Sequence, residues 1–264
     1  MKLSFNRLRR VPWTFRQPLT RIPDYNSSIS DLFLWRRGED WSTVFELINM
    51  PGIITGDIEA ESPVELQAFD SAGKSIVIKK FNLQGAFRHQ IEFDELFKDI
   101  DGQYGTFAIF HEAIPAQLQE SGSFLAERGY TGYRFQQAPI FNYVHGNLDA
   151  VARELNGNTS RLESDSMLPR SYVLQYEFNP DGQNELALVN ASSKGKKITF
   201  YVESMASGRV LAEFAELIPA GGCVLKNLHQ VAEESFRIRI RSRLVMARPL
   251  IFVGNEHYRD AFHG

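Results

Sequence analysis

The sequence contains one cysteine, Cys223, among its 264 residues. A single thiol excludes an intramolecular disulfide, so packing and hydrogen bonds must hold the fold together. Cys223 follows Gly221 and Gly222 and has no adjacent basic residue that would favour a reactive thiolate. We therefore expect a small buried side chain at the start of a strand. The lack of disulfides suits a reducing compartment, so we expect a cytoplasmic protein.

The sequence also lacks the patterns that mark membrane spans and common enzymes. No apolar run approaches the length of about 20 residues that a transmembrane helix needs. There is no Gly-x-Ser-x-Gly elbow, no phosphate-binding loop and no Gly-x-Gly-x-x-Gly turn. The six histidines form no His-x-x-x-His or His-Glu-x-x-His pair. These absences favour a non-catalytic protein without a cofactor.

Charge is unevenly distributed in a chain whose formal net charge is −3. Residues 1–37 contain eight basic and two acidic residues, a net charge of +6, so the remainder carries −9. Pro12, Pro18 and Pro23 exclude a long helix there, and we expect residues 1–30 to form a basic extended arm. Such an arm can contact an anionic partner or subunit, or lie along acidic domains as a strap. Nucleic acid is the less favoured partner, because no nucleic-acid-binding motif accompanies the charge.

A pattern of apolar residues that ends in asparagine occurs twice. Residues 45–49 (Phe-Glu-Leu-Ile-Asn) are matched by residues 186–190 (Leu-Ala-Leu-Val-Asn). An alternating run follows each copy, and the two runs end in the turns Gly73-Lys74 and Gly208-Arg209. Period-two alternation predicts half-buried strands, and glycine suits hairpin turns. Repetition of the whole pattern predicts that the chain contains the same unit twice.

Many short strands separated by turn signals are typical of β-sandwiches. The sequence predicts a mainly β protein with two tandem, internally duplicated antiparallel β-sandwich domains and a few short helices. We expect helical segments at 93–97, 116–120 and 148–155, the last capped by Asn147. Residues 184–252, with their apolar-Val-Asn, strand, glycine turn, strand and Pro-Ala-Gly-Gly pattern, resemble immunoglobulin-like modules of bacterial surface proteins. That resemblance implies a sandwich scaffold and no particular activity.

Domain boundaries follow from breaks in the repeated pattern. We expect a first sandwich at 31–155, a polar linker at 156–170 and a second sandwich at 171–264. The first copy carries an insertion at 112–138, rich in Gly, Tyr and Arg, that the second copy lacks. A long loop that is not repeated is a natural location for a site on a repeated scaffold.

The insertion and the residues after it provide the side chains that we expect to bind a ligand. Arginines can hold anionic groups, tyrosines can stack on a sugar ring, and histidine and asparagine can hydrogen-bond to it. Alternatively, Glu127 pairs with one of the arginines and the tyrosines fill the join between the domains. We favour a non-catalytic binding or assembly protein whose ligand is a glycan or a partner protein. The candidate ligand-binding residues are Arg128, Tyr130, Tyr133, Arg134, His145 and Asn147.

Two alternatives remain at the level of sequence. In the first, a metal-dependent enzyme uses His145, His257 and His263, with Glu256 or His111 as a further ligand. In the second, a scaffold subunit docks through its basic N-terminal arm. Convergence of the histidines in space would favour the enzyme.

Overall fold

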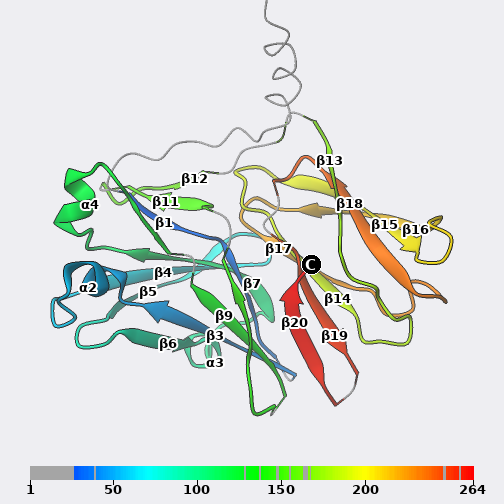
Figure 1. Cartoon of the computed structure of the whole chain (residues 1–264), viewed down its shortest axis with the longest axis horizontal. Helices are drawn as coiled ribbons and strands as arrows, with labels where there is room; N and C mark the ends of the chain where they lie inside the picture. The colour runs from blue at the N-terminus through cyan, green and yellow to red at the C-terminus, as the bar shows by residue number, and fades with distance from the viewer. Residues whose placement is uncertain are drawn as a thin grey trace, which may run out of the picture.

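The structure is a computed structural model that describes residues 27–38, 40–127, 129–136, 138–146, 149–154, 156–162, 166, 168–245, 248–255 and 257–264. The described part consists mainly of five four-stranded sheets, and this confirms the predicted β-sandwich class. Two sandwiches lie side by side, the N-terminal one coloured blue to green and the C-terminal one yellow to red, with the C-terminus between them (Figure 1).

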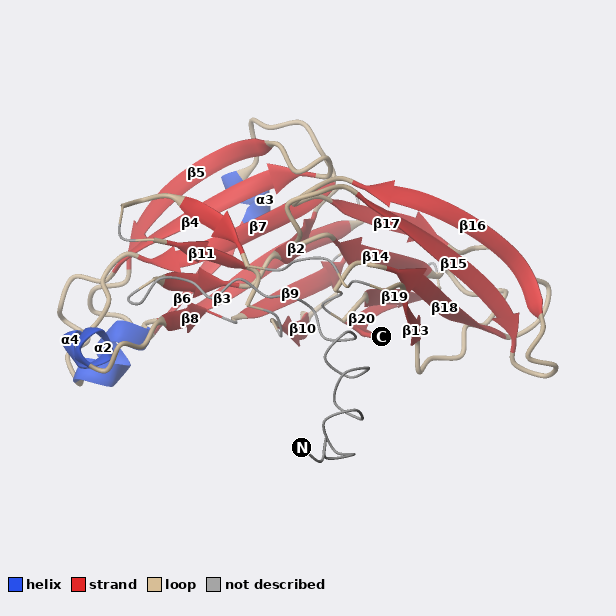
Figure 2. Cartoon of the chain, turned by 90° about the horizontal axis from the view of Figure 1, so that it is seen from above, coloured by secondary structure: helices blue, strands red, loops and turns tan. Residues whose placement is uncertain are grey.

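The N-terminal sandwich is built from two sheets whose buried faces share one aromatic core. Phe33 and Phe107 come from one sheet and Phe45 from the other, and their ring centroids lie 4.9–5.3 Å apart. Figure 2 shows the two sheets as layers. In spatial order the first sheet contains β2 (Phe33–Arg36), β7 (Tyr104–His111), β4 (Pro63–Asp70) and β5 (Ser75–Asn82). The second sheet contains β6 (Arg88–Glu92), β3 (Trp41–Ile48), β9 (Tyr130–Phe135) and β10 (Asn142–His145).

The C-terminal sandwich repeats this arrangement. One sheet contains β13 (Arg170–Val173), β18 (Phe236–Ser242), β15 (Lys196–Ser204) and β16 (Val210–Ile218). The other contains β17 (Cys223–Asn227), β14 (Glu185–Val189), β19 (Leu250–Gly254) and β20 (Arg259–His263). In both halves the first strand therefore pairs with the sixth, whereas in immunoglobulin constant-type domains it pairs with the second. A common origin of the two halves stays a prediction.

Asn49 and Asn190 directly follow the second strands of their halves, and both are fully buried. The Nδ2 atom of Asn49 donates to the carbonyl of Leu83 at 3.3 Å, and that of Asn190 donates to the carbonyl of Ile218 at 3.0 Å. Leu83 and Ile218 stand at matching places, where the fourth strand of each half ends. In each half, the repeated asparagine thus adds a buried side-chain hydrogen bond to the backbone where the fourth strand ends.

Three short helices lie in the described part: α2 (Met50–Thr55), α3 (Phe93–Leu96) and α4 (Ala116–Glu120). The last two lie where the sequence predicted them. Asn49 caps α2, because its Oδ1 atom accepts from the backbone N of Gly52 at 2.9 Å. The helix predicted at 148–155 is wrong, since Val151–Arg153 form strand β11. The gain from pairing and burying this segment outweighs its weak local helical preference.

A small third sheet covers the outer face of the N-terminal sandwich. Ala108 and Phe110 on β7 pack under Ala150 and Val151. All its pairs are antiparallel except that of β1 (Ser28–Ser30) with β8 (Leu125–Glu127), which is parallel. Strand β1 lies inside the predicted arm at 1–30, and β12 (Thr159–Arg161) lies inside the predicted linker at 156–170. In spatial order the sheet contains β12 (Thr159–Arg161), β11 (Val151–Arg153), β1 (Ser28–Ser30) and β8 (Leu125–Glu127).

The predicted insertion at 112–138 contains elements of two kinds. Helix α4 and strand β8 have no counterpart in the described part of the C-terminal half. Strand β9, in contrast, occupies the same place as β19, next to the second strand of its half. The extra elements therefore end before Tyr130, where the shared scaffold resumes.

The two sandwiches share a buried interface. Trp41 and Tyr133 of the N-terminal half contact Phe252 of the C-terminal half edge to face, with ring centroids 4.9 and 5.3 Å apart. Cys223 belongs to the same cluster and begins β17, as the sequence predicted. The backbone N of Cys223 donates to the carbonyl of Ser71 at 3.0 Å, which joins turns of the two halves. The interface places strands β10 and β20, the edge strands of the two sandwiches, side by side.

Candidate ligand-binding face

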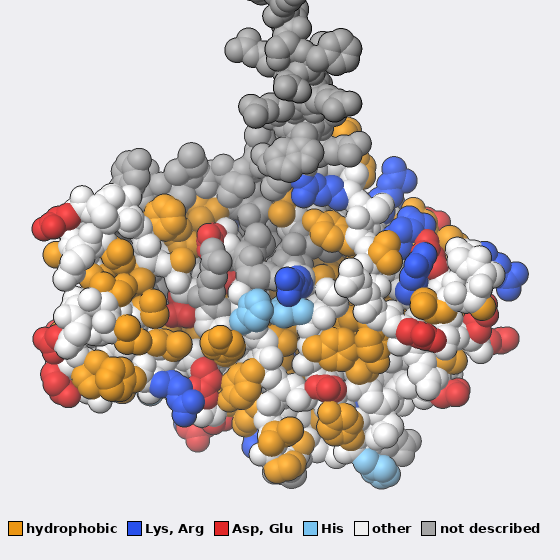
Figure 3. Space-filling view, in the orientation of Figure 1, with side chains coloured by type: hydrophobic (Ala, Val, Ile, Leu, Met, Phe, Trp, Pro, Cys, Tyr) orange, Lys and Arg blue, Asp and Glu red, His pale blue; other side chains and the backbone are white. Residues whose placement is uncertain are grey.

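The outer face of the sheet β6-β3-β9-β10 carries the side chains best suited to a ligand. Side chains alternate between the two faces along a strand. On β9, Tyr133 points into the interface between the sandwiches, whereas Tyr130 and Arg134 point to the opposite, outer face. The register places Tyr130 between His145 on β10 and Glu46 on β3. Figure 3 views this side of the molecule, where hydrophobic side chains lie beside acidic and basic ones.

A glycine allows one tyrosine of this face to lie across the sheet. Gly132 is paired with Tyr143 on one side and with Val44 on the other. A Cβ atom on Gly132 would lie 2.8 Å from Cε1 of Tyr143 and 2.8 Å from Cγ2 of Val44. Without that atom the ring crosses β9, and its hydroxyl donates to Oε1 of Glu46 at 3.0 Å. The ring remains 45 % exposed and forms a platform on the sheet.

The polar end of this platform is fixed by charge. Glu46 accepts from Tyr143 and also pairs with Arg88, whose Nε atom lies 3.2 Å from its Oε2 atom. Burial, and then the hydrogen bond to Glu46, raise the pKa of Tyr143 to about 12. The hydrogen bond from the hydroxyl to Glu46 holds the ring in place.

Arg134 adds a cationic group at the same face. Its guanidinium carbon lies 4.5 Å from the ring centroid of Phe141, within cation–π range, and its Nε atom donates to Oγ of Ser42 at 3.3 Å. The ring of Phe141 lies 6.2 Å from that of Tyr143. Two aromatic rings and one positioned arginine are thus neighbours on one surface.

An open groove of about 420 Å³ continues from this surface past the end of β9. Its lining includes Ile48, Met50, Glu127, Tyr130 and His145. Its volume lies within the range of small-molecule sites, and its lining combines apolar, aromatic and polar side chains. The groove can therefore accept the part of a ligand that extends beyond the tyrosines.

The structure brings together three of the residues that the sequence predicted. Tyr130, Arg134 and His145 lie on the same outer face. Tyr133 was wrongly expected to stack on a ligand: it is fully buried, and its hydroxyl donates to the carbonyl of Leu34 at 2.8 Å. Tyr133 lies three positions after Tyr130 on β9, so the two side chains point to opposite faces of the sheet. The ring of Tyr133 belongs to the interface between the sandwiches. The remaining candidates, Arg128 and Asn147, lie outside the described residues.

Tyr143 is a residue of this face that was not predicted from the sequence. The residue stands two positions before His145, so both point to the same side of β10. Its role depends on pairing with Gly132, a relationship that no local pattern reveals. The available signal was the alternation along residues 141–145, which predicts that Phe141, Tyr143 and His145 share one face.

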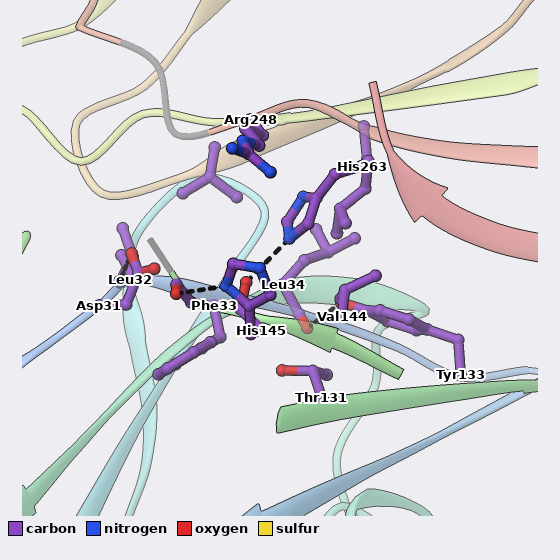
Figure 4. Close-up of a pocket in the computed structure, with 14 residues that line it drawn as sticks. Asp31, Leu32, Phe33, Leu34, Thr131, Tyr133, Val144, His145, Arg248 and His263 are labelled. Atoms are coloured by element: carbon purple, nitrogen blue, oxygen red, sulfur yellow. Dashed lines mark hydrogen bonds between the residues drawn. The ribbon is translucent and has the colours of Figure 1, made fainter. Parts of the chain in front are cut away.

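His145 and His263 meet where the edge strands of the two sandwiches lie side by side (Figure 4). Their ring centroids are 5.4 Å apart, and Nε2 of His263 donates to the carbonyl of His145 at 2.8 Å. A small pocket of about 40 Å³ at this place is also lined by Asp31 and Arg248. Burial, together with the charges of His145 and Arg248, lowers the pKa of His263 although its hydrogen bond opposes the shift. Two histidines from different halves thus form a contact between sandwiches.

The other histidines proposed as metal ligands lie elsewhere. His257 lies in the turn at the far end of the β19–β20 hairpin from His263, and the five-residue strand β20, which leads from this turn to His263, spans roughly 14 Å. His111 is buried, and its Nε2 atom lies 2.9 Å from Oε2 of Glu127. Glu256 lies outside the described residues. Among the residues that the structure describes, no three His, Cys, Asp or Glu side chains are grouped as metal ligands.

No family model matches the chain, and no curated protein matches it. The VP2 protein of infectious bursal disease virus, solved as a D431N mutant in derived T=1 particles, aligns at 12 % identity and a TM-score of 0.17. That alignment covers 98 % of this chain and 74 % of the viral chain. In the described part of the chain, no helix is long and apolar enough to cross a membrane.

Proposed function

We propose that this protein is a non-catalytic binding protein that holds a glycan on the outer face of the sheet β6-β3-β9-β10. The observation that carries this proposal is the ring of Tyr143, which lies across Gly132 and is anchored by Glu46. A fixed aromatic ring with a solvent-exposed face can stack against the apolar face of a sugar ring. Because the ring is already held in its position, binding costs little side-chain entropy.

Neighbouring groups supply the polar contacts that a glycan requires. Glu46 and Arg88 lie at the hydroxyl end of Tyr143, and Arg134 lies beside Phe141. Carboxylate and guanidinium groups can respectively accept from and donate to sugar hydroxyls. The groove beside Tyr130 and His145 extends the surface for a second or third sugar unit. A surface loop of a partner protein is the second ligand that this chemistry allows.

The metal-dependent enzyme is less well supported by the geometry. His145 and His263 converge, but His257 does not join them. Elemental analysis of protein purified without chelator decides this alternative, because a metal-dependent enzyme would contain a stoichiometric amount of bound metal. The scaffold alternative rests on the basic arm, and residues 1–26 lie outside the described part of the chain.

A glycan array tests the proposal. We expect wild-type protein to bind a restricted set of glycans and to lose them when Tyr143 is replaced by alanine. The matched control is Tyr258→Ala, because Tyr258 is similarly exposed, at 53 %, but lies on the β19–β20 hairpin of the other sandwich. An array without any specific signal, together with a native pull-down without a partner, would refute the proposal.

A further inference from the structure

Strand β18 of the C-terminal sandwich presents a row of arginines on its outer face. Phe236, Ile238 and Ile240 alternate with them and are fully buried in the core. The intervening side chains therefore point outward. We call this set the arginine row: Arg237, Arg239 and Arg241.

The equivalent strand of the N-terminal sandwich has a different outer face. Strands β4 and β15 each carry a register shift, after Ala68 and after Val202, which makes Leu66 equivalent to Phe200. Leu66 pairs with Ile109 and Phe200 pairs with Ile240, so Ala108 of β7 stands where Arg239 stands in β18. By the same register, Phe110 corresponds to Arg241. Ala108 and Phe110 are buried under the third sheet, which packs on β7.

No strand of the described residues forms a corresponding third layer over β18. The side chains of Arg237 and Arg239 are 42 % and 27 % exposed, and Arg241 is exposed. Figure 3 shows basic side chains gathered over this part of the C-terminal sandwich. The same scaffold position is therefore an internal apolar layer in one half and a cationic surface in the other.

The arginine row is held in place by its neighbours. Glu203 on β15 accepts from Nε of Arg239 at 2.6 Å and from Nε of Arg237 at 3.1 Å. The guanidinium carbon of Arg239 lies 4.1 Å from the ring centroid of Tyr201. Lys197 adds a further exposed cation. It lies four residues before Tyr201 on the same strand, so both side chains point to the same face. The row thus offers positioned guanidinium groups in a chain whose overall charge is negative.

The geometry points to an acidic polysaccharide as the ligand of this face. Successive arginines lie two residues apart on an extended strand, which spaces them by roughly 6.8 Å. An extended sugar chain with a carboxylate or sulfate group on each repeat can lie along such a row, and each guanidinium can hold one anionic group in bidentate fashion. The face lies on a different sandwich from Tyr143, so the inference does not depend on the function proposed above.

A nucleic acid fits this face less well. Single-stranded nucleic acids gain about 1–3 kcal/mol per base by stacking on exposed aromatic rings. Among the described residues that pair with Arg237, Arg239 and Arg241 on the neighbouring strands, the aromatic one is Tyr201. The guanidinium of Arg239 covers its ring. The surface therefore recognises a chain of charges and offers no platform for bases.

The test measures the binding of several polymers to the full-length protein at several salt concentrations. Heparin and polygalacturonate are the acidic polysaccharides, dextran is the neutral polymer, and a single-stranded oligonucleotide is the competing polyanion. We expect wild-type protein to bind at least one acidic polysaccharide, to ignore dextran, and to bind the oligonucleotide more weakly. Binding that is weakest for both polysaccharides, or strongest for the oligonucleotide, overturns the inference.

Two charge-matched variants locate the site. Arg239→Ala with Arg241→Ala should weaken polysaccharide binding by about tenfold or more and reduce the salt dependence, because two ion contacts are lost. Lys74→Ala with Lys79→Ala removes the same charge from the exposed β4–β5 hairpin and should change affinity less than about twofold. Arg241→Ala alone serves if the double variant is unstable. Equal losses in the arginine and lysine variants would contradict the proposed site.

Discussion

Arg36 and Glu185 form a bidentate ion pair that joins the two sandwiches. The Nη1 and Nη2 atoms of Arg36 donate to the carboxylate of Glu185 at 2.8 and 3.0 Å. The guanidinium carbon of Arg36 also lies 4.5 Å from the ring centroid of Trp41 and 4.9 Å from that of Phe252. Burial lowers the pKa of Arg36, and its hydrogen bond to Glu185 opposes that shift. The pair fixes β2 of one half against β14 of the other.

Replacing Glu185 with alanine should destabilise the protein by about 3 kcal/mol, because it leaves the charge of Arg36 in a buried interface without its main partner. Denaturant unfolding measures the change. The matched control is Glu216→Ala, which breaks the pair with Lys226 in which both side chains are about one-third exposed. That pair should contribute less than about 1 kcal/mol. Similar losses in the two variants would contradict a structural role for the interface pair.

Asn190→Ala should cost more stability than Asn49→Ala. The Nδ2 atom of Asn190 donates to the carbonyls of Lys194, Ile218 and Pro219, and its Oδ1 atom accepts from Ser192. Each buried group left without a partner costs about 1–3 kcal/mol. Asn49 makes fewer such bonds, with Leu83 and Gly52. Thermal unfolding of the two variants gives the order, and a larger loss for Asn49→Ala would refute it.

Acidification should weaken the contact between the edge strands. The pKa of His263 is lowered in the folded protein, so the unfolded chain binds its proton more readily. Stability from the neutral ring is complete above the unfolded pKa of about 6.5 and declines as pH falls through the lowered folded pKa. We expect the melting temperature of wild-type protein to fall more between pH 7 and pH 5 than that of His263→Gln. His257→Gln, at the exposed end of the same hairpin, should keep the wild-type slope. Parallel slopes in all three proteins would exclude this role for His263.

Cys223 should resist thiol reagents in the native protein. Burial raises the pKa of its thiol far above the ordinary range, and its side chain is 4 % exposed in the interface cluster. Alkylation followed by mass spectrometry should show modification only under denaturing conditions. Rapid modification of native protein would indicate that the interface opens.

The sequence predicted those parts of the fold that rest on local patterns. Alternation along 64–70 and 198–204 located strands β4 and β15, and both runs end in the expected glycine turns. Local pattern did not predict the third sheet, because all four of its strands are only three residues long and β1 pairs with segments far away in the sequence. A three-residue strand carries too little alternation to be recognised.

The candidate site was predicted only in part for a related reason. Which face a strand residue occupies depends on register, and a shift by one residue exchanges the two faces. Tyr130 and Tyr133 therefore looked equivalent in the sequence although they point in opposite directions. Tyr143 acquires its position from Gly132 on the neighbouring strand, and this pairing is a property of the fold.

Calorimetric titration of the tightest-binding array glycan into three proteins tests whether Tyr143 forms part of the binding site. We expect Tyr143→Ala to weaken binding by about tenfold, roughly 1.4 kcal/mol, because the sugar loses its stacking platform. Tyr258→Ala should bind like wild type, since this exposed ring lies on the other sandwich. Unchanged affinity in Tyr143→Ala, with its folded state intact, would contradict a binding site on the outer face of the sheet β6-β3-β9-β10.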